Sequence, residues 1–71
     1  MNVEGLNYFI QQMTLLIPTD LPKDTRIEMY KERLYKVDLV KSLADSQSER
    51  NKVGMLESKI VSELKSLGVD V

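Results

Sequence analysis

The chain has 71 residues with no cysteine or histidine, and its ten basic and eleven acidic side chains leave a net charge of −1. A chain of this length forms a single domain, residues 1–71, with a marginal core, and it has no disulfides and no thiolate or imidazole metal ligands to supplement that core. Self-association is the supplement that remains. The balanced charge argues against an electrostatic partnership with nucleic acid or with an anionic membrane surface.

The first predicted element is a helix over about residues 4–17, because apolar residues recur there at spacings of three and four. Its packing face comprises Leu6, Phe9, Ile10, Met13, Leu16 and Ile17. Pro18 keeps the residue before it out of the helical region, so Ile17 is the last position expected to be helical. No apolar run is longer than residues 15–17, far short of the roughly 20 residues that span a bilayer, and no export signal is recognisable. A cytoplasmic protein with no membrane attachment is therefore expected.

The second predicted element is one long helix over about residues 23–67, since neither glycine nor proline occurs between Lys23 and Val53. Its apolar residues follow coiled-coil spacing on both sides of a polar interval near residues 44–48. The proposed helix-pairing seam comprises Ile27, Tyr30, Leu34, Val37, Val53, Leu56, Ile60, Leu64 and Leu67. Leu39, Val40 and Leu43 broaden this stripe, and Met55 beside it is expected to fill the core. Gly68 is suited to end the helix, and the last three residues are expected to form a frayed tail.

The polar interval leaves two topologies open. In one, the helix continues through it for a total of about 66 Å. In the other, the chain breaks near residues 44–48, Ser46 caps a third helix with Glu49 closing a capping box, and the fold is a three-helix bundle. Because the interval lacks the glycine or proline that tight connections favour, we predict the continuous helix. The predicted fold is all-α, with a short first helix and a long second helix paired in an antiparallel homodimeric bundle.

Antiparallel pairing predicts a register in which the numbers of facing residues sum to about 91. Apolar residues then face apolar residues, and charged residues face opposite charges except for the like-charged pair of Glu28 and Glu63. The facing pairs include Ile27 with Leu64, Val37 with Val53, Asp38 with Lys52, and Lys41 with Glu49. A hairpin within one chain and an antiparallel dimer of two chains predict the same contacts.

Three stretches of the chain resemble the YvfG family of small uncharacterised Bacillus proteins of about the same length. These stretches are Tyr8-Phe9-Ile10, the aromatic and β-branched stripe over residues 27–37, and Arg50-Asn51-Lys52-Val53 with Leu56. The resemblance implies a helical hairpin that associates as a homodimer. It carries over no catalytic, cofactor-binding or ligand-binding residue.

The composition also limits the chemistry that the chain can perform. Without histidine and cysteine, the commonest acid–base and nucleophilic side chains are missing, so we do not expect an enzyme. Asp24, Glu28 and Glu32 share one helix face, but acidic residues near a helix N-terminus are favoured by the helix dipole and typically form a solvated face. No metal or cofactor is expected.

The expected function is non-catalytic protein–protein interaction of a regulatory kind, with a second copy of the chain as the first partner. This expectation rests on an apolar stripe larger than one short chain can cover. The alternative is a nucleic-acid-binding helical adaptor that contacts phosphates through Arg26, Arg33 and Lys36.

Overall fold

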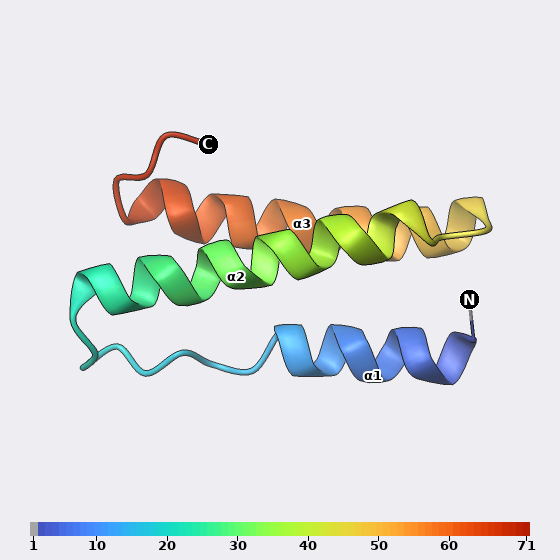
Figure 1. The fold of residues 1–71 in the computed structure, drawn as a ribbon, viewed down its shortest axis with the longest axis horizontal. Helices are drawn as coiled ribbons and strands as arrows, with labels where there is room; N and C mark the ends of the chain where they lie inside the picture. Colours follow the sequence, from blue (N-terminus) through green and yellow to red (C-terminus); the bar gives the residue numbers. More distant parts are fainter. Residues whose placement is uncertain (1) are drawn as a thin grey trace.

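The computed structural model describes residues 2–71 and shows three α-helices and no strand within that range. Helix α1 spans Val3–Met13, α2 spans Lys23–Ser42 and α3 spans Gln47–Ser66. Helices α2 and α3 form an antiparallel hairpin, and α1 lies alongside it with the same direction as α3 (Figure 1). The prediction of an all-α fold is confirmed.

The predicted continuous helix over residues 23–67 is wrong, and the three-helix alternative fits the structure better. Helix α2 ends at Ser42, after which the backbone N–H groups of Leu43 and Ala44 donate to the carbonyls of Val40 and Lys41 at 2.9 and 3.2 Å. These short-range bonds tighten the last turn, so the chain leaves the helix without a glycine or proline.

Two side chains fix the start of α3. Ser46 is the N-cap, and its hydroxyl oxygen accepts a hydrogen bond from the N–H of Glu49 at 3.2 Å. The Glu49 carboxylate in turn accepts from the N–H of Asp45 at 2.7 Å, and Glu49 is buried. This is a capping box in which the glutamate reaches one residue further back than usual. The reciprocal bonds satisfy backbone donors that a continuous helix would not expose, so they specify the break.

Helix α1 ends at Met13, four residues before the predicted end at Ile17. At its start, the Asn2 side chain accepts from the N–H groups of Glu4 and Gly5 at 2.7 and 3.2 Å. At its end, the Thr14 hydroxyl donates to the carbonyl of Gln11 at 3.0 Å. Residues 14–17, which were predicted as the last turn of the helix, belong instead to the non-helical connection to α2.

Helix α3 is the centre of the molecule, because it contacts both α1 and α2. Its buried apolar residues are spaced by three or four and form one stripe: Val53, Leu56, Ile60 and Leu64. Helix α2 adds Val37 and α1 adds Leu6 to the same core. The core thus brings together all three helices.

The end of α3 is a Schellman motif. Gly68 has a φ of 88°, its N–H donates to the Lys65 carbonyl at 3.0 Å, and the Val69 N–H donates to the Leu64 carbonyl at 3.0 Å. The predicted role of Gly68 is confirmed. The prediction of a frayed tail is wrong for Val69, because this residue is half-buried and packs against the core.

The two glycines near and within α3 predict stability changes of opposite sign. A methyl group at Gly54 would meet no atom within 4 Å, so Gly54→Ala is expected to stabilise the protein by about 1 kcal/mol through helix propensity alone. Gly68→Ala forces a side chain into the left-handed region and is expected to cost about 1 to 2 kcal/mol. Thermal denaturation followed by circular dichroism measures both. A destabilised Gly54→Ala would show that this position is closely packed in solution.

Candidate interaction surfaces

The proposed helix-pairing seam is buried unevenly. Its α3 residues form the central stripe described above, whereas on α2 only Val37 is fully buried. The other α2 members are half-buried and pack against the core: Ile27, Tyr30 and Leu34. Leu67, the C-cap of α3, is half-buried. Thus α2 covers α3 from one side and leaves much of its own surface to solvent.

Two charged contacts between α2 and α3 differ from the predicted facing pairs. The Lys41 Nζ lies 3.2 Å from the Glu57 Oε1, whereas Lys41 was predicted to face Glu49. Asp38 was predicted to face Lys52 but hydrogen-bonds to the Glu57 side chain. The physical reason is that Glu49 serves the turn as a cap and is no longer a surface carboxylate.

The contact between Asp38 and Glu57 shifts the pKa values of both groups. The hydrogen bond between the two side chains raises the pKa of Asp38, because the protonated form is the donor. The same bond lowers the pKa of Glu57, and the neighbouring Lys41 ammonium lowers it further. One edge of the hairpin therefore carries the Asp38 and Glu57 carboxyl groups beside the Lys41 amine.

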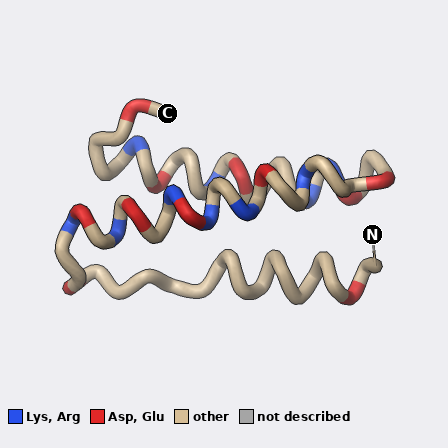
Figure 2. Tube along the Cα trace, in the orientation of Figure 1, with Lys and Arg blue, Asp and Glu red and all other residues tan. Residues whose placement is uncertain are grey.

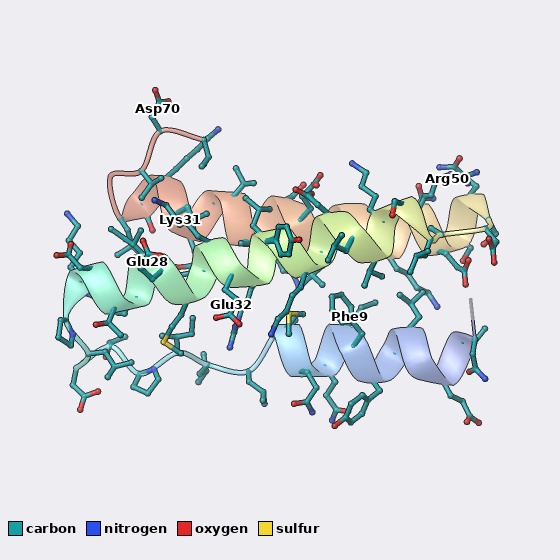
Figure 3. All side chains as sticks on the ribbon, in the orientation of Figure 1. Phe9, Glu28, Lys31, Glu32, Arg50 and Asp70 are labelled. Carbon is teal, nitrogen blue, oxygen red and sulfur yellow. The ribbon has the colours of Figure 1, made fainter. Side chains whose placement is uncertain are left out.

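Only some of the residues predicted to form the packing face of the first helix lie within α1. Leu6 is buried, and Phe9, Ile10 and Met13 are half-buried against the core; Phe9 extends from α1 toward the hairpin (Figure 3). Leu16 is 95 % exposed and Ile17 is buried, but both lie in the connection after the helix. The helical spacing that placed Leu16 on this face does not apply beyond Met13.

The three basic residues of the nucleic-acid alternative are engaged in contacts within the chain. The Arg26 Nε donates to the Leu21 carbonyl at 3.1 Å, and the Arg33 Nη1 donates to the Met13 carbonyl at 2.9 Å. The Lys36 Nζ lies 3.2 Å from a glutamate within α2. Both signs of charge alternate along α2 and α3 (Figure 2). This surface has no continuous basic face of the kind that phosphate binding requires.

Arg33 is expected to stabilise the fold, because it hydrogen-bonds a carbonyl at the C-terminus of α1 and lies with its guanidinium 5.9 Å from the Tyr30 ring centre. Arg33→Met keeps the aliphatic stem and removes both contacts. We expect a loss of about 1.5 kcal/mol, the worth of a charge-assisted hydrogen bond, measured by urea denaturation. The matched control is Lys31→Met, which removes only a surface ion pair. Equal losses for the two variants would contradict the assigned role.

Two members of the acidic row on α2, Glu28 and Glu32, are paired with lysines of the same helix. Glu28 lies 4.0 Å from Lys31, and Glu32 lies 3.2 Å from Lys36; Glu28, Lys31 and Glu32 all project from α2 (Figure 3). Residues 2–71 contain no group of three side chains placed to hold a metal ion. Within the same range, no helix is long and apolar enough to cross a membrane.

Tyr35 and Leu39 of α2, and Leu43, its C-cap with an αR backbone, form a row of exposed apolar side chains that we call the outer stripe. Their exposed fractions are 65 %, 51 % and 62 %. The three residues are spaced by four, so they share one helix face, and Val37 on the opposite face is fully buried. The sequence-based assignment of Leu39 and Leu43 to the core stripe is wrong. Their spacing from Tyr35 is the signal that identifies a separate face.

A second surface feature is a groove that runs along α3. Two neighbouring hollows of about 220 and 290 Å³ share Thr14, Leu56 and Lys59 in their linings, and we call the pair the α1–α3 groove. Its apolar rim includes Met55, which is 66 % exposed although the sequence predicted a core position. The exposed leucines of the connection, Leu15 and Leu16, line one end.

Comparisons with known proteins add no assignment. The chain matches no family model, no curated protein and no solved structure. The resemblance to the YvfG family therefore stays a prediction, and the functional argument rests on the surfaces just described.

Proposed function

We propose that this protein is a non-catalytic interaction protein that forms a symmetric homodimer through the outer stripe of α2. The observation that carries the proposal is the row of exposed large apolar side chains at Tyr35, Leu39 and Leu43. Contiguous exposed apolar residues on a small protein are typical of an interaction site. The composition supports a non-catalytic role, since the chain has no histidine or cysteine.

The outer stripe is complementary to itself. If two copies pack α2 against α2 antiparallel about a twofold axis at Leu39, each Tyr35 faces Leu43 of the second copy and the two Leu39 side chains meet. Such an isologous contact uses the same patch on both chains and closes after two copies. Helix dimers of this kind stabilise a chain whose own core is small.

The charges that flank the outer stripe are compatible with this contact. Glu28 is paired with Lys31, and Glu32 is paired with Lys36, all within one helix. The flanks are therefore locally neutral, and two copies can approach without net repulsion between like charges.

Sedimentation equilibrium at micromolar concentrations tests the proposal. We expect a dimer for the parent chain and a monomer for Leu39→Glu, because the substitution places two carboxylates at the twofold axis. The matched control is Leu16→Glu, which adds the same charge at a more exposed leucine outside the stripe and should leave the dimer intact. A monomeric parent chain, or a Leu39→Glu variant that still dimerises, would contradict the proposal.

A further inference from the structure

The α1–α3 groove has the length and direction of a helix-binding site. In the larger hollow, Asn7, Ile10 and Thr14 face α3 residues from Lys52 to Lys59. The smaller hollow extends along α3 to Glu63, where it is faced by residues 13–16 and by Tyr30 and Arg33 of α2. From Lys52 to Glu63, α3 rises by about 17 Å, which is the length of about three turns of a docked helix. Helices α1 and α3 run in the same direction (Figure 1), and a further helix docked over these hollows would give a four-helix arrangement.

The groove is apolar where a docked helix would rest. Leu56 and Ile60 are buried beneath it, Ile10 is half-buried on its wall, and Met55 is largely exposed at its edge. Methionine is an adaptable apolar side chain that is common at helix-binding surfaces. The floor can therefore accept an apolar stripe of leucine-like residues.

The rim of the groove is mainly basic. Lys52 and Lys59 lie seven residues apart on one side of α3, and neither forms an ion pair within residues 2–71. Arg33 lies at one end of the groove, and Glu63 is the single acidic residue in its lining. Seven residues correspond to about two turns of any α-helix. Lys52 and Lys59 can therefore face two carboxylates that are seven residues apart on a partner helix.

We propose that the α1–α3 groove binds one amphipathic helix of a partner protein, with an apolar stripe against Ile10 and Leu56 and carboxylates facing Lys52 and Lys59. Binding follows the helix-in-groove mode, in which apolar anchors supply affinity and flanking charges supply orientation. The site lies apart from the outer stripe of α2, so it extends the proposed function to a second partner and does not depend on dimerisation.

The test uses a fluorescein-labelled synthetic helix of three to four turns, with leucines at positions i, i+3, i+4 and i+7 and glutamates flanking them. Fluorescence anisotropy at low ionic strength is expected to show saturable binding. The same peptide with lysine in place of glutamate is expected to bind at least about tenfold more weakly, because its charges then oppose Lys52 and Lys59.

A pair of variants locates the site. Lys59→Glu is expected to weaken binding of the glutamate peptide about tenfold, whereas Lys65→Glu makes the same change of net charge outside the groove lining and should have little effect. Met55→Glu should also weaken binding, while Leu39→Glu should leave it unchanged even if the dimer is lost. Unchanged circular dichroism melts verify that each variant folds.

Four results would overturn the proposal. They are absence of peptide binding, equal effects of Lys59→Glu and Lys65→Glu, equal binding of the two peptides, and loss of the dimer in Met55→Glu, which would mean that a second copy occupies the groove. Saturable binding of polyuridylate that is lost in Lys59→Glu would overturn it too, because the rim would then be a phosphate site.

Discussion

Replacing Ile60 by Asp is expected to leave the protein largely unfolded at room temperature. Ile60 is 3 % exposed in the central stripe of α3, so the substitution removes a buried side chain worth about 2 to 5 kcal/mol. It also leaves a carboxylate without a partner in the core, which adds several kcal/mol or forces the group to take up a proton. Small domains of this kind are stable by only about 5 kcal/mol, so the loss is comparable to the whole. Circular dichroism and the dispersion of amide NMR signals measure it.

Two further substitutions provide smaller expected losses of stability with which the effect of Ile60→Asp can be compared. Ile60→Val removes one methylene group and is expected to cost about 1 kcal/mol. Ser62→Asp introduces the same carboxylate at an exposed position of α3 and is expected to change stability by less than about 0.5 kcal/mol. An Ile60→Asp variant that melts like the parent chain would show that α3 is not the centre of the core.

Replacing Leu6 by Ala is expected to release α1 before it affects the hairpin. Leu6 is the only buried residue of α1 and is 1 % exposed, so its truncation costs about 3 kcal/mol. The remaining apolar residues of α1 are half-buried, and an isolated helix of eleven residues is not stable in water. Hydrogen exchange followed by NMR is expected to show lost protection at the amides of α1, while those of α2 and α3 keep most of theirs.

The control for α1 is Val3→Ala, which truncates an apolar residue that is 59 % exposed on the same helix. We expect little change in exchange at any amide of this variant. A uniform loss of protection across all three helices in Leu6→Ala would contradict independent release of α1. It would indicate that α1 and the hairpin unfold as one cooperative unit.

The features that could be predicted from the sequence are those that depend on neighbouring residues or on the regular repeat of a helix. The spacing of Val53, Leu56, Ile60 and Leu64 was enough to predict the stripe that α3 buries, because a helix repeats every 3.6 residues. Gly68 was predicted as the terminator, since few other residues tolerate its left-handed backbone. The capping pair of Ser46 and Glu49 was also recognised, but as the second choice.

The topology could not be chosen from the stripe alone. A hairpin and a pair of long helices place the same residues in contact, so only the turn separates them. The missing glycine or proline favours a continuous helix, whereas Glu49 and Ser46 form the turn through side-chain hydrogen bonds. The bond from Arg33 to the Met13 carbonyl, which contributes to ending α1, joins residues twenty positions apart. No local rule predicts such a contact.

The candidate surfaces were harder to predict than the core. Hydrophobicity alone placed Leu39 and Leu43 with Val40 in one broad stripe, but the first two are exposed and Val40 is half-buried. The orientation of a helix about its axis depends on its neighbour, and a wide apolar stripe leaves that rotation undetermined. The α1–α3 groove depends on the path of residues 14–17, which a pattern of helical spacing does not describe.

The Schellman motif at Gly68 determines how far the chain can be shortened from its C-terminal side. Removing Val71 and Asp70 leaves every hydrogen bond of the motif in place. Removing Val69 as well deletes the donor to the Leu64 carbonyl and an apolar side chain that covers the core. Residue 69 is therefore the last one that α3 needs, and a fusion partner or affinity tag attached after it would leave the bundle complete.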